Sequence, residues 1–289
     1  MKLSVILCTH NPRADHLART LQGLAVQSLP RDAWELLVVD NASVPPLAPR
    51  LDLSWHPAAR VALEPVPGLV AARLRGIAEA RGSLLVFVDD DNVLAADYLE
   101  RAGGLAEQWP QLGAFGGQIH GEFEVPPSPW FAARLDRLAI REFTAEHRAM
   151  QPDPAFAPCG AGLCVRATVA RHYSELVAAD PRRRSLGRSG RNLGSGEDTD
   201  LVLTANELGF ETGRFPGLQL THLIPRARLT LRYFAKITRG HARAKLDLLA
   251  LHPAMPGHRQ ATWAARRALW KWAAIDTVLG LLPARSSAP

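Results

Sequence analysis

The most constraining feature of this sequence is an apolar run, residues 84–88, that leads directly into Asp89, Asp90 and Asp91. Leu and Val dominate the run, and its length is typical of a strand buried on both faces of a parallel sheet. Open α/β sheets bind ligands at the carboxyl ends of such strands. Three adjacent aspartates repel one another unless a cation lies among them, and Mg²⁺ or Mn²⁺ suits oxygen ligands. The alternative is a solvated acidic turn, because aspartate also favours turns and helix caps.

Strand and helix signals alternate through the first half of the chain. Strands are expected at 3–8, 36–39, 61–64 and 84–88, and helices from Pro12, at 69–81 and at 95–109. The alternation predicts an α/β fold with a doubly wound, mainly parallel sheet. Polar residues end three of these strands, at Thr9, Asp40 and Asp89, so their side chains are expected along one edge of the sheet. No GxGxxG follows the first strand and no GxxxxGKS/T occurs, which argues against a dinucleotide site and a P-loop.

The second half of the chain has a less regular pattern. We expect a helix at 130–147, a glycine turn before a strand at 163–166, a helix after an acidic pair, and a short strand at 218–222. Glycines let a backbone approach a ligand closely, so the glycine turn either lines an acceptor site or is a tight turn without a ligand. The arginine-rich segment 182–196 is either a solvated loop or a lid whose arginines approach phosphates.

The charge and the cysteines narrow the functional classes. The 34 Lys and Arg exceed the 28 Asp and Glu, and the formal net charge of +6 suits phosphorylated ligands or anionic membranes. No nucleic-acid-binding signature accompanies the charge, so no nucleic-acid partner is expected. The three cysteines form no disulfide framework and no zinc spacing, which favours a reducing, cytoplasmic setting. The sequence shows no signal peptide and no run of about 20 apolar residues that would span a bilayer.

A set of motifs, in order over residues 3–240, resembles the family 2 inverting glycosyltransferases of the GT-A fold. They are SVILCTHN (4–11), VVDNAS (38–43), EPVPGL (64–69), FVDDD (87–91), GAG (160–162), GED (196–198), HLIP (222–225) and RLT (228–230). The resemblance implies a GT-A domain at 1–225, with a Rossmann-like nucleotide-sugar-binding half at 1–123 and an acceptor half at 124–225. A helical C-terminal extension follows at 226–289. It also implies transfer from a nucleotide-diphosphate sugar, with UDP first and dTDP or GDP next, to a saccharide, lipid-linked or small-molecule acceptor.

The resemblance gives each matching residue an expected role. Residues expected to contact the nucleotide sugar are Thr9, Asn11, Asp40 at the nucleobase, Glu64, Arg73, Asp89 and Asp90. A Mn²⁺ or Mg²⁺ ion is expected on Asp91, Asp89 and His222, with Asp91 as the direct ligand. Asp198 matches the catalytic base, and the acceptor side is expected to include Gly160, Ala161, Gly162 and Glu197. One departure is Leu74, which stands where the family has an asparagine after the arginine.

Inverting sugar transfer needs two carboxylate clusters with different tasks, and the sequence offers both. Attack on the anomeric carbon opposite the leaving diphosphate requires a base that deprotonates the acceptor hydroxyl, the role expected of Asp198. A divalent cation neutralises the leaving diphosphate, so no general acid is needed. A non-catalytic nucleotide-sugar-binding or scaffold protein of the same fold is the alternative. A nucleotidyltransferase is a further alternative, but it would need a basic glycine-rich loop after the first strand.

The C-terminal extension is expected to contain two long helices, at 229–251 and 261–282. The second carries several tryptophans and basic residues: Trp263, Trp270, Trp272, Arg266, Arg267 and Lys271. This composition is typical of a helix at a membrane interface, which would give peripheral attachment to the inner face of the membrane. The alternatives are that the aromatic rings pack against the catalytic domain or form a homodimer contact.

Overall fold

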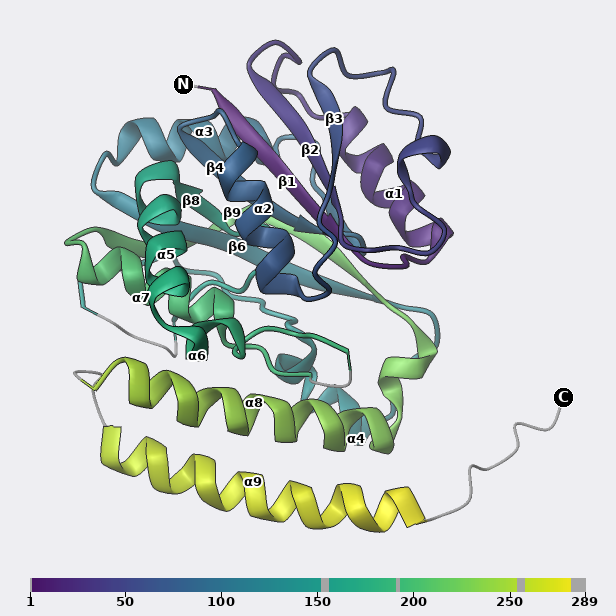
Figure 1. Cartoon of the computed structure of the whole chain (residues 1–289), viewed down its shortest axis with the longest axis vertical. Helices are drawn as coiled ribbons and strands as arrows, with labels where there is room; N and C mark the ends of the chain where they lie inside the picture. Colours follow the sequence, from purple (N-terminus) through teal and green to yellow (C-terminus); the bar gives the residue numbers. More distant parts are fainter. Residues whose placement is uncertain (1, 152–155, 191–192, 254–257, 282–289) are drawn as a thin grey trace, which may run out of the picture.

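The expected strands assemble into one mixed β-sheet with helices on both faces (Figure 1). The computed structural model describes residues 2–151, 156–190, 193–253 and 258–281. In the described part the strand order is β3-β2-β1-β4-β8-β6-β9-β5, with β7 paired to β9. The strands are β1 (Leu3–Thr9), β2 (Trp34–Asp40), β3 (Ala59–Leu63), β4 (Leu84–Asp89), β5 (Asn92–Leu94), β6 (Leu112–Phe123), β7 (His147–Ala149), β8 (Cys164–Arg166) and β9 (Glu211–Ile224).

The first four strands pair in parallel, which confirms the predicted Rossmann-like half of the α/β fold. The register places Thr9 of β1 opposite Asp40 of β2, and Cys8 of β1 opposite Asp89 of β4. The polar ends of these three strands therefore lie side by side at one edge of the sheet, as the sequence predicted.

Side chains alternate between the two faces of the parallel half, and each face is covered by helices. Leu84, Val86 and Val88 of β4 pack in the core beneath α1 (Ala14–Ala25) and α3 (Tyr98–Gln108), whereas Leu85 and Phe87 pack on the opposite face. That second face is covered by α2 (Leu69–Glu79), α5 (Ala167–Ala179) and α7 (Glu197–Glu207). A strand buried on both faces must be apolar throughout, which explains the continuous run that precedes the aspartates.

The second half of the sheet mixes parallel and antiparallel pairs. β8 is antiparallel to β4 and to β6, whereas β6 and the long strand β9 are parallel. The short strand β5 is antiparallel to β9, with Asn92 opposite His222. The N–H of Leu223 also donates to the carbonyl of Asp91 at 2.9 Å. This ladder brings His222 beside the aspartate cluster, although more than 100 residues separate them in sequence.

The prediction of a helix at 130–147 is wrong. Only the short helix α4 (Pro129–Ala132) and the 3₁₀ turn η2 (Leu135–Leu138) form there. Ala139 has a left-handed φ of 60° after η2, and Arg141 then pairs with Ile119 in an isolated antiparallel bridge. Pairing with the sheet overrides the local helical preference of this segment. The helix α5 was not expected from the sequence.

The remaining elements complete the chain around the sheet. They are the 3₁₀ turns η1 (Ala48–Arg50) and η3 (Arg226–Leu229), and the helices α6 (Pro181–Arg184), α8 (Leu231–Leu251) and α9 (His258–Leu281). Helices α8 and α9 confirm the two expected C-terminal helices and lie side by side as a hairpin along one side of the molecule (Figure 1). Among the described residues, no helix is both long and apolar enough to cross a membrane.

The three tryptophans of α9 have different environments. Trp272 packs against Phe234 of α8, with ring centroids 5.4 Å apart. Trp263 and Trp270 are 64% and 79% exposed, and Arg267 lies over the Trp263 ring. Packing against the protein therefore accounts for Trp272 but not for the other two. Parts of two predicted segments lie outside the described residues. They are Arg191 and Asn192 in the segment 182–196, and residues 254–257 and 282–289 in the C-terminal extension 226–289.

Candidate active site

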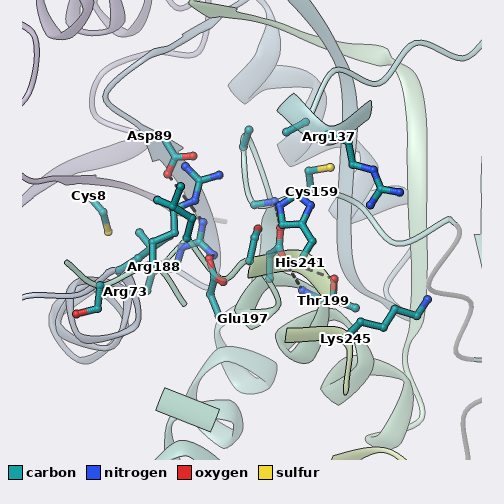
Figure 2. A pocket seen from close by; sticks show the side chains of 18 of the residues that line it. Cys8, Arg73, Asp89, Arg137, Cys159, Arg188, Glu197, Thr199, His241 and Lys245 are labelled. Atoms are coloured by element: carbon teal, nitrogen blue, oxygen red, sulfur yellow. Dashed lines mark hydrogen bonds and ion pairs between the residues drawn. The ribbon is translucent and has the colours of Figure 1, made fainter. Parts of the chain in front are cut away.

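The carboxyl ends of β1, β2 and β4 open onto a cavity of about 890 Å³. Its wall combines these strand ends with the turn at 157–161, the first residues of α7, and the inner side of the α8–α9 hairpin. Side chains from all four sources point toward one space (Figure 2). Concave sites of this size at the carboxyl edge of an α/β sheet are typical ligand sites.

The three aspartates after β4 have three different environments. The side chain of Asp89 is about one-third exposed at the cavity, and its backbone N–H donates to Oδ1 of Asn92 at 3.2 Å. Asp90 accepts a hydrogen bond from the Thr9 hydroxyl, and burial together with the neighbouring Asp91 raises the pKa of Asp90 to about 7. Oδ1 of Asp91 accepts a hydrogen bond from Nδ2 of Asn92 at 3.0 Å. The side chain of Asn92 thus fixes the turn that carries the cluster.

Asp91 is buried and ion-paired. Its Oδ2 lies 2.9 Å from Nη2 of Arg228 and 3.4 Å from Nε2 of His222. Burial alone would raise the pKa of Asp91, but the contacts with His222 and with the Arg228 guanidinium outweigh it and hold this pKa well below its usual range. Asp91 is therefore ionised at neutral pH.

The predicted metal ligands are only partly brought together. Among the described residues no three His, Cys, Asp or Glu side chains meet as a metal-binding cluster, so Asp89, Asp91 and His222 do not form a complete site by themselves. Asp91 and His222 nevertheless adjoin each other at the cavity, and Asp89 faces the same space. One or two carboxylates completed by substrate phosphates and water is the usual arrangement for Mg²⁺. The residues present fit a divalent cation that is bound together with its ligand.

A buried ion pair lies between the aspartate cluster and α7. Nη1 of Arg73, from α2, lies 3.2 Å from Oε1 of Glu197, and Nη2 of Arg73 lies 3.9 Å from Oδ1 of Asp89. Both Arg73 and Glu197 are about 4% exposed. Burial raises the pKa of Glu197 to about 7, and the nearby Asp198 adds to the rise while Arg73 opposes it. Arg73 thus connects the expected donor side to the expected acceptor side.

The carboxylate of Asp198 is held by two backbone N–H groups. Oδ2 accepts from the N–H of Gly160 at 2.8 Å, and Oδ1 accepts from the N–H of Thr199 at 2.7 Å. A Cβ at Gly160 would lie 2.4 Å from Nη2 of Arg73, so a larger residue there would displace the guanidinium that pairs with Glu197. Asp198 and Gly160 both line the cavity, so the structure brings these two expected residues into direct contact.

The other two residues of the glycine turn have separate positions. Ala161 lines the cavity, whereas the carbonyl of Gly162 accepts a hydrogen bond from the buried Tyr98 hydroxyl at 2.6 Å. Gly162 has a left-handed φ of 70°, and a Cβ there would meet the same hydroxyl at 2.5 Å. Gly162 therefore shapes the turn from behind and does not face the cavity.

Three expected nucleotide contacts are turned to the backbone in this structure. Asp40 is buried and accepts from the N–H groups of Ser43 and Leu47 at 3.0 and 2.8 Å. Asn11 accepts from the Val44 N–H, and Glu64 accepts from the Val66 N–H, each at 2.8 Å. None of Asp40, Asn11 and Glu64 is among the described residues that line the cavity, whereas Thr9 is. The nucleobase role of Asp40 stays a prediction.

Asn41 has a structural role that was not predicted from the sequence. Its Nδ2 donates to the carbonyls of Glu64 and Val66 at 3.1 and 2.7 Å, and its Oδ1 accepts from the Gly68 N–H at 2.7 Å. Asn41 also lines the cavity. The side chain therefore ties the end of β2 to the loop that leads into α2. Its place directly after Asp40 in the VVDNAS motif was the available signal.

The arginines of segment 182–196 have different roles. Arg182 forms an exposed ion pair with Asp180, and the buried Arg183 pairs with Asp200 of α7. Arg188 lines the cavity, and its backbone carbonyl accepts from the N–H of Leu69 at the start of α2 at 2.9 Å (Figure 2). Its charge helps to lower the pKa of Asp91. Of the described arginines in this segment, Arg188 is the one that fits an approach to phosphates.

A buried network fixes α7 from the side away from the cavity. Asp200 accepts from Arg183 and lies 2.7 Å from Nε2 of His252, and Nδ1 of His252 lies 2.6 Å from Glu207. Burial would lower the pKa of His252, but the two carboxylates raise it above its ordinary value. Because Asp200 lies in the first turn of α7, the network holds the helix that carries Asp198. No sequence pattern indicated it.

Two cysteines line the cavity without being nucleophiles. Burial raises the pKa of Cys8 to about 12 and that of Cys159 to about 11, so both thiols stay protonated at neutral pH. All three cysteines are free, as the sequence predicted. Covalent thiol chemistry is therefore not what this cavity provides.

The fold and the cavity define a protein of the GT-A class. Half of its sheet is parallel and Rossmann-like, and carboxylates lie at the carboxyl edge of that half. Residues 4–169 match the family model described as glycosyl transferase family 2, and the chain belongs to this family. Two curated relatives agree with it. They are an uncharacterised glycosyltransferase, YwdF, of Bacillus subtilis, 34% identical over 101 residues, and the glycosyltransferase AglE of Haloferax volcanii, 28% identical over 137 residues. These matches cover 35% and 46% of this chain and 37% and 44% of the relatives.

Solved structures share the fold at low identity. TarS of S. aureus, residues 1–349, has a TM-score of 0.52 and 18% identity over 86% of this chain and 66% of that one. GalNAc-T7 in complex with UDP, GalNAc and Mn²⁺ has a TM-score of 0.50 and 16% identity, and the match covers 77% of this chain and 43% of that one. These similarities confirm the GT-A fold predicted from the sequence.

Proposed function

We propose that this protein is a metal-dependent, inverting glycosyltransferase that uses a nucleotide-diphosphate sugar. The observation that carries the proposal is that two carboxylate clusters with different environments, Asp89–Asp91 and Glu197-Asp198, line one cavity. Family membership supports sugar transfer, and the GalNAc-T7 complex with UDP and Mn²⁺ supports a UDP-sugar and a divalent cation. Mn²⁺ and Mg²⁺ both suit the carboxylate ligands.

On the donor side, the residues would hold the diphosphate and its cation. Asp91 and Asp89, with His222 beside them, would hold the cation, which when bound neutralises charge on the leaving diphosphate. Arg188 lines the same space and would approach the phosphates. A positive partner would also favour ionisation of Asp90, whose raised pKa of about 7 reflects burial and its acidic neighbours. These groups position the donor and stabilise the leaving group.

On the acceptor side, Asp198 would remove the proton from the acceptor hydroxyl. The hydroxyl oxygen forms a bond to the anomeric carbon, the bond from that carbon to the diphosphate oxygen breaks, and the proton passes to Asp198. The N–H groups of Gly160 and Thr199 hold the carboxylate in a fixed orientation. Neither group carries a formal positive charge, so the carboxylate can still accept a proton. Arg73 pairs with Glu197, which keeps that carboxylate out of the reaction.

Asp198→Asn tests the base. The amide cannot take a proton, so we expect the transfer rate to fall by about 10²- to 10⁴-fold. UDP affinity should stay within a few-fold of wild type by calorimetric titration, because Asp198 contacts the turn at Gly160 and not the aspartate cluster. The matched control is Asp32→Asn, an exposed carboxylate outside the cavity, which should leave both quantities unchanged. Loss of UDP binding together with turnover in Asp198→Asn would contradict the base role.

Asp91→Ala tests the metal. Wild-type protein should bind a UDP-sugar more tightly with Mn²⁺ or Mg²⁺ than with chelator, and the variant should bind equally weakly in both conditions. The reason is that Asp91 is the ionised carboxylate beside His222 at the cavity. Donor binding to wild type that is unaffected by chelator would refute the metal-dependent model. Release of UDP from a panel of donors by wild type would separate an enzyme from a non-catalytic binding protein.

A further inference from the structure

The cavity continues past Asp198 into a region with several basic side chains. Arg137 of η2, Arg141 after it, and His241 and Lys245 of α8 all line this part. Figure 2 shows Arg137, His241 and Lys245 around the space on the side opposite Asp89 and Arg73. These residues come from two segments about 100 positions apart in the sequence. We call this part of the wall, Arg137, Arg141, His241 and Lys245, the basic wall.

The basic wall carries positive charge that the protein itself does not neutralise. Two arginines near the aspartate cluster are paired, Arg73 with Glu197 and Arg228 with Asp91. In the basic wall, Arg137 has Asp136 at 3.5 Å. Within the described residues neither Arg141 nor Lys245 has a carboxylate within ion-pair distance. An uncompensated positive region in a cavity attracts anionic ligands.

Arg141 is held rigidly enough to recognise a ligand. Its backbone N–H and carbonyl both pair with Ile119 of β6, at 3.0 and 2.8 Å. Its Nη1 donates to the carbonyls of Asp136 and Ile140 at 2.7 and 2.9 Å. The remaining guanidinium donors are thus presented from a fixed position, which lowers the entropy lost when they bind an anion.

The imidazole of His241 lies close to several of these positive charges. Burial lowers its pKa to about 4, and the charges of Arg188, Arg137 and Arg141 contribute to that decrease, while Asp198 opposes it. The imidazole is therefore neutral at physiological pH and adds no charge of its own. Burial is the main cause of the shift, and the three arginines show that positive charges lie close to His241.

Another part of the cavity wall is apolar. Leu248 of α8 borders it, and α9 contributes residues at helical spacing: Ala261, Ala264, Ala265, Ala268 and Trp272. Residues at these intervals share one face of a helix, so the inner face of α9 is lined mainly by methyl groups. The candidate base, the basic wall and this apolar section therefore all line one cavity.

We propose that the acceptor is an anionic amphiphile, a phosphate or diphosphate ester on an apolar chain. Arg141 and Lys245 bind the anionic group, and the inner face of the α8–α9 hairpin binds the apolar chain. The inference rests on the proposed glycosyltransferase function and names the acceptor class of that site. The reacting hydroxyl belongs to the same acceptor, and its proton passes to Asp198 as described above.

The test uses dodecyl phosphate, inorganic phosphate and dodecyl maltoside as probes of the full-length protein, below their micellar concentrations, by calorimetry. We expect dodecyl phosphate to bind at least tenfold more tightly than either other probe, because it alone satisfies both parts of the site. The double variant Arg141→Gln/Lys245→Gln should lose about tenfold to a hundredfold in affinity for dodecyl phosphate, because both charge-assisted contacts to the phosphate are removed. Arg232→Gln/Lys236→Gln, exposed positions on the same helix α8 that do not line the cavity, should retain wild-type affinity.

Two further measurements separate the parts of the proposal. Ala264→Trp, which fills the apolar section, should weaken binding of dodecyl phosphate but not of inorganic phosphate. Equal binding of inorganic phosphate and dodecyl phosphate to wild type would overturn the apolar part, and unchanged binding by the Arg141/Lys245 variant would overturn the proposal as a whole. UDP binding is measured on every preparation. Its absence from wild type would count against the proposed function, whereas its persistence with no dodecyl phosphate binding would count against the acceptor class alone.

Discussion

Replacing Arg73 by methionine isolates the energy of the buried ion pair between α2 and α7. The guanidinium lies 3.2 Å from Glu197, and its centre lies 5.5 Å from the centroid of the Phe87 ring. Methionine keeps an unbranched apolar side chain against Phe87 but carries no charge. The substitution therefore removes the counter-ion of a carboxylate that is only 4% exposed, with little change in packing.

The expected loss of stability is large. Removing one partner of a buried ion pair costs about 3–5 kcal/mol, because the other charge remains buried without compensation. Unfolding entropy is about 2.1 cal/mol/K per residue, or about 0.6 kcal/mol/K for 289 residues. The melting temperature of Arg73→Met should then fall by about 5–8 °C at pH 8. Asp89 adds little to this loss, because it lies 3.9 Å from Arg73 and is one-third exposed.

The loss should depend on pH through Glu197. The native pKa of about 7 lies above the unfolded value of 4.5, so between these pH values the native state holds a proton that the unfolded state has released. Stability therefore falls as pH rises from about 4.5 to about 7. Without Arg73 the native pKa of Glu197 rises further, and the fall continues to higher pH. The loss of stability in Arg73→Met should therefore be larger at pH 8 than at pH 5 by up to about 1.4 kcal/mol, which is the free energy of the one pH unit between the wild-type pKa of Glu197 and pH 8.

Urea unfolding of nucleotide-free protein at pH 5, 7 and 8 measures these differences. The series comprises wild type, Arg73→Met, Glu197→Gln and the double variant. Because glutamine leaves no buried charge, the double variant should be more stable at pH 8 than the sum of the single losses predicts, by about 1–3 kcal/mol. An Arg73→Met loss that is the same at pH 5 and pH 8, or a strictly additive double variant, would refute the reasoning.

Two further predictions concern the hairpin. His252→Gln should destabilise the protein by about 3–5 kcal/mol at pH 6, because it breaks a buried ionic network. The native pKa of His252 is raised above 6.5, so this contribution is fully present below about pH 6.5 and is lost as pH rises through the native pKa. The difference from wild type in urea unfolding should therefore shrink by pH 9. A pH-independent difference would exclude a protonated His252. Trp263→Ser/Trp270→Ser should lower the fraction of protein that floats with phosphatidylglycerol vesicles several-fold, because both rings are exposed beside basic residues. Equal flotation of wild type and variant would remove the membrane-contact hypothesis.

The parallel half of the fold was predictable because its signals are local. A strand buried on both faces must be apolar, so residues 84–88 indicated β4 directly, and the polar residues after it marked the sheet edge. Parallel pairing then brought Thr9, Asp40 and Asp89 together, as expected. The segment after Pro129 was not predictable in this way, because a bridge between Arg141 and Ile119 of β6 decides its path. Only the folded sheet supplies that partner.

The candidate site was predictable where a motif carries it and not where the tertiary structure does. Asp91 and Asp198 lie in the cavity as their motifs indicated, whereas Asp40 uses both carboxylate oxygens for the turn that follows it. Sequence pattern gives a residue's position on a strand but not the direction of its side chain once a turn competes for it. Lys245 and His241 were missed because an amphipathic helix shows which face is polar but not which polar residues face a cavity.

The two sides of the cavity are built on different kinds of structure. Asp89 and His222, which lies beside Asp91, are fixed by hydrogen-bonded strand registers, so a shift of one residue would displace every side chain of a buried strand. Most of the opposite wall comes from α8 and α9, which contribute no strand to the sheet. A hairpin of different sequence can therefore replace this one without altering any strand register, provided that it keeps His252 against Asp200 and Glu207. In the proposed enzyme, acceptor preference is then an exchangeable property, whereas the donor site is not.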